Sequence, residues 1–284
     1  MKLVTFSQRG IPGVGVLDQG CIRGRLSSDP RFPGNLDTLI RNAPEDLSGT
    51  DTLSDGSTFS FETVQFQPPF TQPEKIICVG LNYRDHTAET TYAQPDYPTL
   101  FTRLTSSLVA HDAPLIRPRV SHALDFEGEL VAVIGRGGRH IERADALKHV
   151  CGYSIFNDAS IRDYQHRTPQ WTVGKNFDGT GAFGPVFVTA DELPPGARGL
   201  ELQTRLNGQV VQKSNTGNLI FDVATLVSTI SEVMTLRPGD LIVTGTPAGI
   251  GHSRTPKLYM KQGDTVEVEI EGIGTLRNVV ADEG

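Results

Sequence analysis

An unbroken run of apolar residues, from Leu130 to Ile134, sets the strongest constraint on how this chain folds. Its side chains are apolar at odd and even positions alike, which is typical of a strand buried on both faces. Asp125, Glu127 and Glu129 come directly before it. Because residues i and i+2 of a strand share a face, we expect Glu127 and Glu129 to point to the same side. Two like charges at the start of a buried strand are costly unless a cation, a basic side chain or solvent compensates them.

These glutamates allow two interpretations, and a third acid bears on the choice. Either they are surface acids at an exposed strand end, or they face a cation in a cleft. Asp158 follows the strand-like segment 150–156. It is well placed to cap the next helix, and equally well placed to face the same cleft. If Glu127, Glu129 and Asp158 converge, they form a hard oxygen site that suits Mg²⁺ or Mn²⁺ rather than zinc.

The rest of the chain predicts a mostly β fold with some α structure. Thirty glycines and 18 prolines in 284 residues favour frequent turns. Residues 1–66 predict a small β-rich N-terminal domain with a helix near 36–41, and the proline-rich connector at 67–73 favours a boundary before a catalytic domain over 67–284. An apolar period of three to four residues predicts one helix over 219–236, stopped by Pro238 and Gly239. Strands are expected at 3–6, 14–17, 21–26, 76–80, 130–134, 151–156, 185–188, 200–206, 241–244 and 266–270.

Charge and composition exclude several classes of function. A net charge of −7 without a Lys/Arg run disfavours binding to nucleic acid or to an anionic membrane surface. No apolar stretch is long enough to span a bilayer, and the first apolar run is too short for a signal peptide. Cys21, Cys78 and Cys151 are odd in number and far apart, which favours reduced thiols in a cytoplasmic protein over a zinc site or disulfides.

The common catalytic and nucleotide-binding motifs are missing from the sequence. Residues 179–184 match G-x-G-x-x-G, but a strand-like segment rather than a helix follows, so we expect no dinucleotide cofactor. There is no G-x-S-x-G, H-E-x-x-H, P-loop or EF-hand pattern. Serine-nucleophile and zinc-protease chemistry therefore have no sequence support.

Five segments stand in a fixed order along the chain: residues 77–89, 125–135, 152–165, 171–178 and 236–251. Together they resemble the fumarylacetoacetate hydrolase superfamily. The resemblance is to members of the acylpyruvate hydrolase and 2-hydroxyhepta-2,4-diene-1,7-dioate isomerase type. It implies a mixed β-roll catalytic domain preceded by a small N-terminal domain, a homodimer, and Mg²⁺ or Mn²⁺ held by Glu127, Glu129 and Asp158.

The resemblance also implies roles for six further residues. His86 and Glu89 match a catalytic dyad on a lid, and Lys175 matches a cation that stabilises enolate charge. The substrate-binding positions of the family match Arg162, Gln165 and Thr246.

Without the resemblance, the same residues have ordinary explanations. His86 and Glu89 are three apart, as on a solvated helical turn, and Arg162 could pair with Asp158 four residues earlier. Arg103 stands where many members have Lys, so its role is left open.

The function implied is a divalent-metal-dependent hydrolase that breaks the C–C bond of a 1,3-dicarbonyl acid, an acylpyruvate or 2,4-dioxo acid, through a pyruvate enolate at the metal. Decarboxylation or tautomerisation of a related oxo acid, such as oxaloacetate or a hydroxy-diene dioate, is the alternative at the same site. A catalytically inactive ligand-binding protein is a third candidate.

Overall fold

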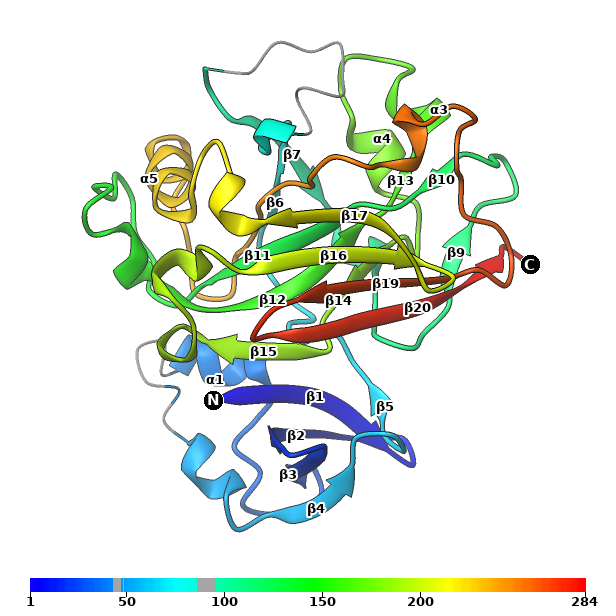
Figure 1. The fold of residues 1–284 in the computed structure, drawn as a ribbon. Helices are drawn as coiled ribbons and strands as arrows, with labels where there is room; N and C mark the ends of the chain where they lie inside the picture. Colours follow the sequence, from blue (N-terminus) through cyan, green and yellow to red (C-terminus); the bar gives the residue numbers. More distant parts are fainter. Residues whose placement is uncertain (43–46, 48, 86–95) are drawn as a thin grey trace.

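The computed structural model of the chain describes residues 1–42, 47, 49–85 and 96–284. Among these residues β-strands dominate, which confirms the expected fold class (Figure 1). The helices are short: α1 Leu36–Asn42, α3 Arg162–Gln165, α4 Thr172–Lys175 and α5 Val223–Val233. None of the helices in this described part is long and apolar enough to cross a bilayer.

Thirteen strands of the described residues form one large mixed sheet. Its central neighbours run in the order β1, β15, β12, β11, β18, β6 and β7. In chain order, its strands are β1 Lys2–Gln8, β2 Ile11–Asp18, β3 Cys21–Leu26, β4 Ser57–Ser60, β5 Gln65–Phe66, β6 Ile76–Gly80, β7 Thr99–Arg103, β8 Leu108–Val109, β11 Gly128–Ile134, β12 Val150–Asp158, β14 Gly181–Phe183, β15 Val186–Thr189 and β18 Leu241–Val243.

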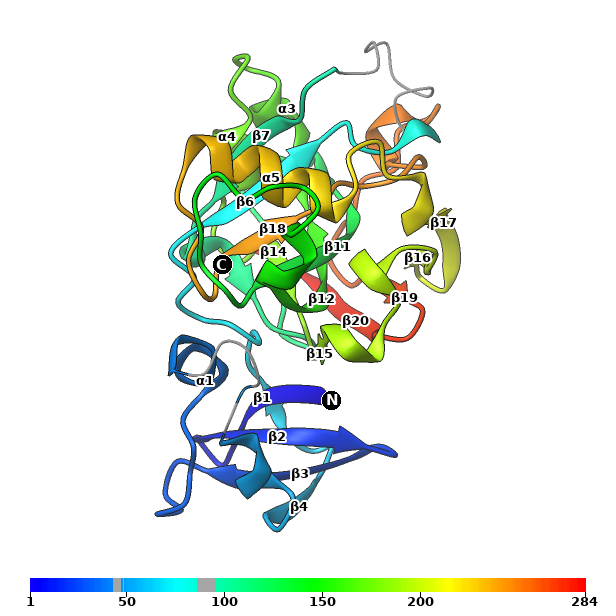
Figure 2. The same cartoon turned by 90° about the vertical axis from the view of Figure 1, so that its left-hand side faces the viewer.

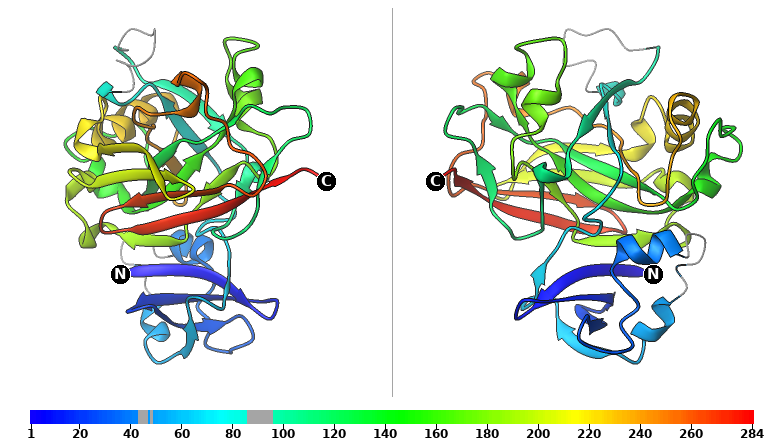
Figure 3. Two further views of the ribbon diagram at one scale, coloured as in Figure 1. Left: turned by 45° about the vertical axis from the view of Figure 1, so that its right-hand side comes forward. Right: turned by 180° about the vertical axis from the view of Figure 1, so that it is seen from behind.

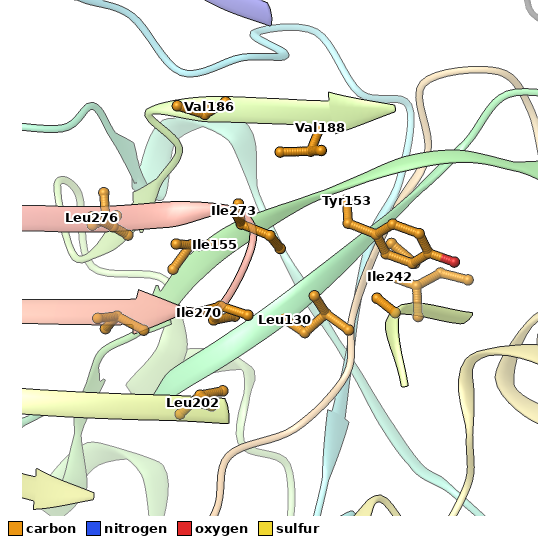
Figure 4. Packing of buried hydrophobic residues seen from close by; sticks show 14 of the residues in the cluster. Leu130, Tyr153, Ile155, Val186, Val188, Leu202, Ile242, Ile270, Ile273 and Leu276 are labelled. Atoms are coloured by element: carbon orange, nitrogen blue, oxygen red, sulfur yellow. The ribbon is translucent and has the colours of Figure 1, made fainter. Parts of the chain in front are cut away.

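A second sheet packs against the centre of the first. It contains, in spatial order, β17 Gln209–Asn215, β16 Glu201–Leu206, β19 Thr265–Ile270, β20 Gly274–Asp282 and β9 Leu115–Arg117, and a separate pair joins β10 Leu124–Asp125 to β13 Ser160–Ile161. Figure 4 shows the side chains between the sheets, where Leu130 and Ile155 of the large sheet face Leu202 and Ile270 of the second.

The apolar run at 130–134 is buried on both faces, as its pattern predicts. Leu130 and Ala132 belong to the core between the two sheets. Val131 and Val133 belong to a second core on the opposite face, which includes residues of α1 and β6. β11 therefore lies between the two hydrophobic cores of the molecule.

The N-terminal strands are connected to this scaffold by backbone hydrogen bonds. β1 pairs with β15 in the register Leu3 to Phe187, and β2 to β4 follow outward from β1. Figures 2 and 3 show β1 to β4 and α1 gathered on one side of the larger body. The boundary at 67–73 stays a prediction.

Most of the expected strands form within one or two residues of their predicted limits, but the helix over 219–236 is too long at both ends. Helix α5 begins after Asp222, whose carboxylate accepts the Thr225 N–H at 2.9 Å. The Ile220 and Phe221 N–H groups donate instead to the backbone carbonyl and side-chain oxygen of Asn82, both at 2.8 Å. These hydrogen bonds tie residues 220–221 to Asn82, and the helix starts only after them, at the Asp222 cap. At the other end Met234 is extended and Leu236 pairs with Gly138, so the helix stops at Val233.

The segment 179–184 contains strand β14 and leads into β15, so no helix follows its glycines. This agrees with the expectation that it is not a dinucleotide-binding turn.

His111 is buried, with its ring against Phe66 of β5 and its Nδ1 bonded to the backbone of β20. Its Nδ1 accepts the Arg277 backbone N–H at 3.0 Å, and its Nε2 lies 3.3 Å from Asp112. Burial lowers the pKa of His111 to about 4, with only Asp112 opposing the change and Arg277 adding to it. A proton on Nδ1 would also displace the Arg277 hydrogen bond.

We predict that stability falls as the pH drops from about 6.5 toward 4, because the unfolded state then binds a proton that native His111 does not. At pH 5 the His111 contribution to this loss is about 2 kcal/mol. Denaturant unfolding at pH 7 and pH 5 measures it. In a His111→Asn variant, whose side-chain oxygen can still accept the Arg277 N–H, the loss between the two pH values should shrink by about that amount. An unchanged loss would contradict the assignment.

Candidate active site

The candidate site is a cavity of about 80 Å³ at the start of β11. Its walls come from the end of β6, from β7, α3 and α4, and from the loop after β18. Four buried charged side chains line it, namely Glu127, Glu129, Arg162 and Lys175. Such a cavity lowers the local dielectric and strengthens every charge interaction inside it.

Glu127 and Glu129 line this cavity, and the buried Asp158 lies next to them. All three are buried, and one carboxylate oxygen of each lies within 4.8 Å of the others. The register of β11 and β12 brings them together, since Gly128 pairs with Asn157 and the Asp158 N–H donates to the Glu127 carbonyl at 2.8 Å. The interpretation of these acids as ordinary surface charges is therefore wrong.

Asp158 does not cap a helix, which corrects the alternative that its position allowed. Helix α3 begins after Ile161, which provides no side-chain cap. The Asp158 carboxylate is fully buried and binds Lys175 and Arg103 instead. The acid after this strand thus joins the buried charged cluster beside the cavity instead of capping a helix.

Lys175 bridges two of the three acids. Its Nζ lies 2.7 Å from Glu127 Oε2 and 2.6 Å from Asp158 Oδ2. Burial disfavours its charge, but Asp158 and Glu127 outweigh burial and raise the pKa of Lys175. It is therefore an ammonium ion at neutral pH. Helix α4 places Lys175 at this point because it packs closely on α3 at Gly174. A Cβ at Gly174 would lie only 2.4 Å from the backbone nitrogen of Gln165.

Arg103 supplies a second buried cation, and the sequence left its role open. Its guanidinium binds the Asp158 carboxylate, and also Thr180 at 2.8 Å and Ser107 at 3.2 Å. Arg103 binds Oδ1 of Asp158 and Lys175 binds Oδ2, so the two cations together fix the orientation of this carboxylate.

Arg162 is the third buried cation. Its Nε lies 2.8 Å from Asp125, and its Nη1 lies 2.7 Å from Glu127 and 2.8 Å from Gln165 Oε1. The proposed pairing of Arg162 with Asp158 is not formed. Nη2 of Arg162 is buried and has no hydrogen-bond partner among the described residues. An unpaired buried donor is costly, so it is a natural contact point for an anionic ligand.

Thr246 lies in the wall of the cavity with its hydroxyl already engaged. Its Oγ1 donates to the Gly128 carbonyl at 3.1 Å and accepts from Gln212 at 2.8 Å. The structure therefore places Thr246, Gln165, Arg162 and Lys175 in one cavity. His86 and Glu89 lie outside the described residues.

The balance of charge indicates what the site can bind. Burial and the neighbouring Asp158 and Glu127 raise the pKa of Glu129, whose carboxylate also accepts the Gly245 N–H. The buried carboxylates outnumber the buried cations by one, and a divalent cation would reverse this excess and leave room for an anionic ligand. The carboxylates are Asp125, Glu127, Glu129 and Asp158, and the cations are Arg103, Arg162 and Lys175.

The donor set fits Mg²⁺ or Mn²⁺. The three converging groups are carboxylates, which hard divalent cations prefer, and none of them is a thiolate or imidazole. The residues that would hold the ion are Glu127, Glu129 and Asp158.

Sequence reasoning missed several residues of the site. Asp125 was noted only as part of a motif, yet it accepts the N–H groups of Gly251 and His252, both at 2.8 Å, and binds Arg162. His166 and His252 line the cavity, with ring centroids 5.2 Å apart. Their positions depend on loops that meet only in the folded chain, and no local spacing predicts them.

We predict that Mg²⁺ stabilises the protein and that Glu129→Gln removes the effect. A ligand that binds only the native state at 100 times its Kd adds about 2.7 kcal/mol. Thermal unfolding with and without Mg²⁺ provides the measurement. The exposed Glu232→Gln is the matched control and should respond like the parent chain. Equal Mg²⁺ stabilisation of the parent and the Glu129 variant would rule out this metal site.

Comparisons with known proteins agree with this geometry. The mitochondrial oxaloacetate tautomerase fahd2 of Xenopus laevis is 36% identical over 288 residues, covering 99% of this chain and 90% of that protein. A solved fumarylacetoacetate hydrolase of Exiguobacterium antarcticum superposes over the full length of both chains with a TM-score of 0.88 and 37% identity. A solved 2-hydroxyhepta-2,4-diene-1,7-dioate isomerase of Mycobacterium marinum covers 100% of this chain and 99% of its own, with a TM-score of 0.76 and 34% identity.

The family model described as fumarylacetoacetate (FAA) hydrolase, C-terminal, matches residues 75–281, which include every site residue named above. The chain belongs to the fumarylacetoacetate hydrolase family.

Proposed function

We propose that this protein is a divalent-metal-dependent hydrolase that cleaves the C–C bond of a 2,4-dioxo acid of the acylpyruvate type. The observation that carries the proposal is the cluster of Lys175 with Glu127, Glu129 and Asp158 at a cavity that also presents an unpaired Arg162 donor. Such a site can bind a small acid and stabilise negative charge that develops next to its carboxylate.

Arg162 and Gln165 are proposed to bind the carboxylate of the substrate. Arg162 Nη2 can donate to it without breaking any existing hydrogen bond, and Gln165 is held beside the guanidinium at 2.8 Å. The other Arg162 donors remain on Asp125 and Glu127, so the group is oriented before the substrate arrives. Thr246, in the same wall, is proposed to turn its hydroxyl proton from the Gly128 carbonyl to the substrate.

Lys175 is proposed to stabilise the enolate. Asp158 and Glu127 raise its pKa, so we assign it the role of an ammonium hydrogen-bond donor rather than that of a base. An ammonium fixed by two carboxylates is already oriented when charge develops on the 2-oxo oxygen, so little reorganisation opposes the reaction. A bound Mg²⁺ or Mn²⁺ would add Lewis-acid polarisation of the 2-oxo acid group.

His86 and Glu89 are proposed to activate the hydrolytic water, with Glu89 orienting the imidazole. Both lie outside the described residues, so this assignment rests on the family motif alone. The oxygen of the water adds to C4. The bond between C3 and C4 then breaks, and the electron pair of that bond passes to the enolate of the pyruvate fragment.

A tautomerase or isomerase is the second candidate. The Xenopus laevis relative, which aligns with 99% of this chain, is named an oxaloacetate tautomerase. The solved Mycobacterium marinum structure is named an isomerase. Moving a proton between carbon and oxygen of an oxo acid needs the same stabilised enolate but no hydrolytic water, and decarboxylation of oxaloacetate shares that enolate. The described site residues are chemically competent, which argues against an inactive ligand-binding protein.

We further propose that the protein works as a cytoplasmic homodimer on a small oxo acid, as the family resemblance implies. Sedimentation or light scattering at assay concentration tests the dimer.

We predict that the parent protein with Mg²⁺ releases pyruvate from short acylpyruvates and that Lys175→Met lowers kcat by about 100-fold or more, because a preorganised donor to the enolate is lost. The same variant should bind Mg²⁺ at least as tightly as the parent, since the competing ammonium is gone. The exposed Lys213→Met is the control for loss of a lysine. Release of pyruvate by Lys175→Met at the parent rate would refute the role of Lys175.

We predict that His86→Ala separates the two candidate activities. Hydrolysis should fall by about 100-fold or more, the usual effect of losing a positioned general base, while conversion of enol to keto oxaloacetate is retained. Coupled pyruvate detection and the absorbance of the oxaloacetate enol give the two rates. Equal losses in both would contradict this division of roles.

A further inference from the structure

His252 is held in the cavity wall by the same carboxylate that orients Arg162. It lies in the short turn Gly251–Ser253, and the N–H groups of Gly251 and His252 donate to Asp125 at 2.8 Å each. Asp125 also accepts from Arg162 Nε at 2.8 Å. The backbone of His252 and the guanidinium of Arg162 therefore have fixed positions relative to each other.

The contacts of the imidazole assign its tautomer. Nδ1 of His252 lies 2.7 Å from the Tyr259 hydroxyl and 3.5 Å from the Lys257 Nζ. An ammonium can only donate a hydrogen bond, and a phenol can donate as well. Nδ1 is consequently the acceptor, and the proton of the neutral ring is on Nε2.

The surroundings also keep the ring neutral. Burial, Arg162, Lys257 and the adjacent His166 lower the pKa of His252 to about 4, while Asp125 alone favours the charged form. A second proton would have to sit on Nδ1, facing the Lys257 ammonium. At neutral pH the ring is thus an uncharged N–H donor.

Nε2 is the atom of this ring that remains available to a ligand. His252 lines the cavity together with Lys175 and Thr246, whereas Tyr259, the partner of Nδ1, does not line it. Nε2 has no hydrogen-bond partner among the described residues and is not among their fully buried unpaired atoms. Arg162 Nη2, also unpaired, belongs to the same wall.

We propose that His252 is a catalytic residue of this protein, a neutral hydrogen-bond donor to a second oxygen of the substrate beyond its 2-oxo acid group. The proposal rests on the proposed function and specifies its substrate class: an oxo acid with a carbonyl oxygen at C4. A neutral donor stabilises an oxyanion there without transferring a proton to it, because the ring keeps its Nε2 proton.

In the hydrolytic step, the oxygen of water bonds to C4 while the base that activates the water takes its proton. The C4 carbonyl electron pair moves onto the C4 oxygen, where the Nε2–H of His252 donates. The carbonyl then re-forms, the bond between C3 and C4 breaks, and its electron pair passes to the enolate. His252 neither gains nor loses a proton.

The test compares two rates in variants that keep or remove the donor. One rate is pyruvate release from an acylpyruvate, which has the C4 oxygen. The other is hydrogen–deuterium exchange at the methyl group of pyruvate, followed by NMR, which needs enolisation but offers no C4 oxygen. The side-chain amide nitrogen of Gln can reach the place of Nε2, whereas that of Asn reaches only the place of Nδ1.

We expect His252→Asn and His252→Phe to lower acylpyruvate kcat about 100-fold, the usual effect of losing one donor to an oxyanion. Their loss in pyruvate exchange should be at least tenfold smaller, and His252→Gln should recover most of the acylpyruvate rate. Thermal unfolding of each variant verifies that it folds.

Equal losses in the two reactions, or equal rates for His252→Asn and His252→Gln, would overturn the role of His252 alone. If the parent protein neither releases pyruvate from an acylpyruvate nor catalyses exchange at the methyl group of pyruvate, the proposed function is overturned, and the role of His252 with it.

Discussion

The structure depends on an excess of buried negative charge at the start of β11. Three carboxylates converge there, and in isolation each would lose several kcal/mol on leaving water. Lys175, Arg103 and Arg162 offset most of that cost through close contacts. Burial, together with the charges of Asp158 and Glu127, raises the pKa of Glu129. The excess of one buried carboxylate is the basis on which we propose a site for a divalent cation and a small anion. The fold positions these charges, and the chemistry follows from their balance.

The scaffold keeps the charges in place because the strands that carry them are fixed on both faces. β11 is buried between two apolar cores, and its pairing with β12 sets Asp158 against Glu127. Short helices deliver the cations: α3 brings Arg162 and α4 brings Lys175. Asp125 links this machinery to the loop after β18, because it binds both Arg162 and the turn at His252. A change in any of these elements therefore alters the groups proposed to bind substrate as well as the acids proposed to hold a metal.

The sequence predicts what depends on local spacing and fails where distant segments decide. Glu127 and Glu129 meet at one site, as their two-residue spacing predicts. Residues 130–134 are buried, as an apolar run without alternation predicts. Asp158 remained ambiguous because a helix cap and a cleft acid share one local pattern. Both predicted ends of α5 were wrong because distant segments bind the flanking residues: Asn82 accepts the N–H groups of residues 220–221, and Gly138 pairs with Leu236. The roles of Arg103 and Asp125 required the pairing of strands that no local motif encodes.

The central claim is that the three converging acids bind a divalent cation beside which an oxo acid is held by Lys175 and Arg162. A crystal structure with Mn²⁺ and oxalate, a stable mimic of the pyruvate enolate, tests this claim most directly. We predict one anomalous peak among Glu127, Glu129 and Asp158, with oxalate oxygens in hydrogen-bond contact with Lys175 Nζ and Arg162 Nη2. No peak at the triad, or oxalate bound elsewhere while Mn²⁺ is present, would contradict it.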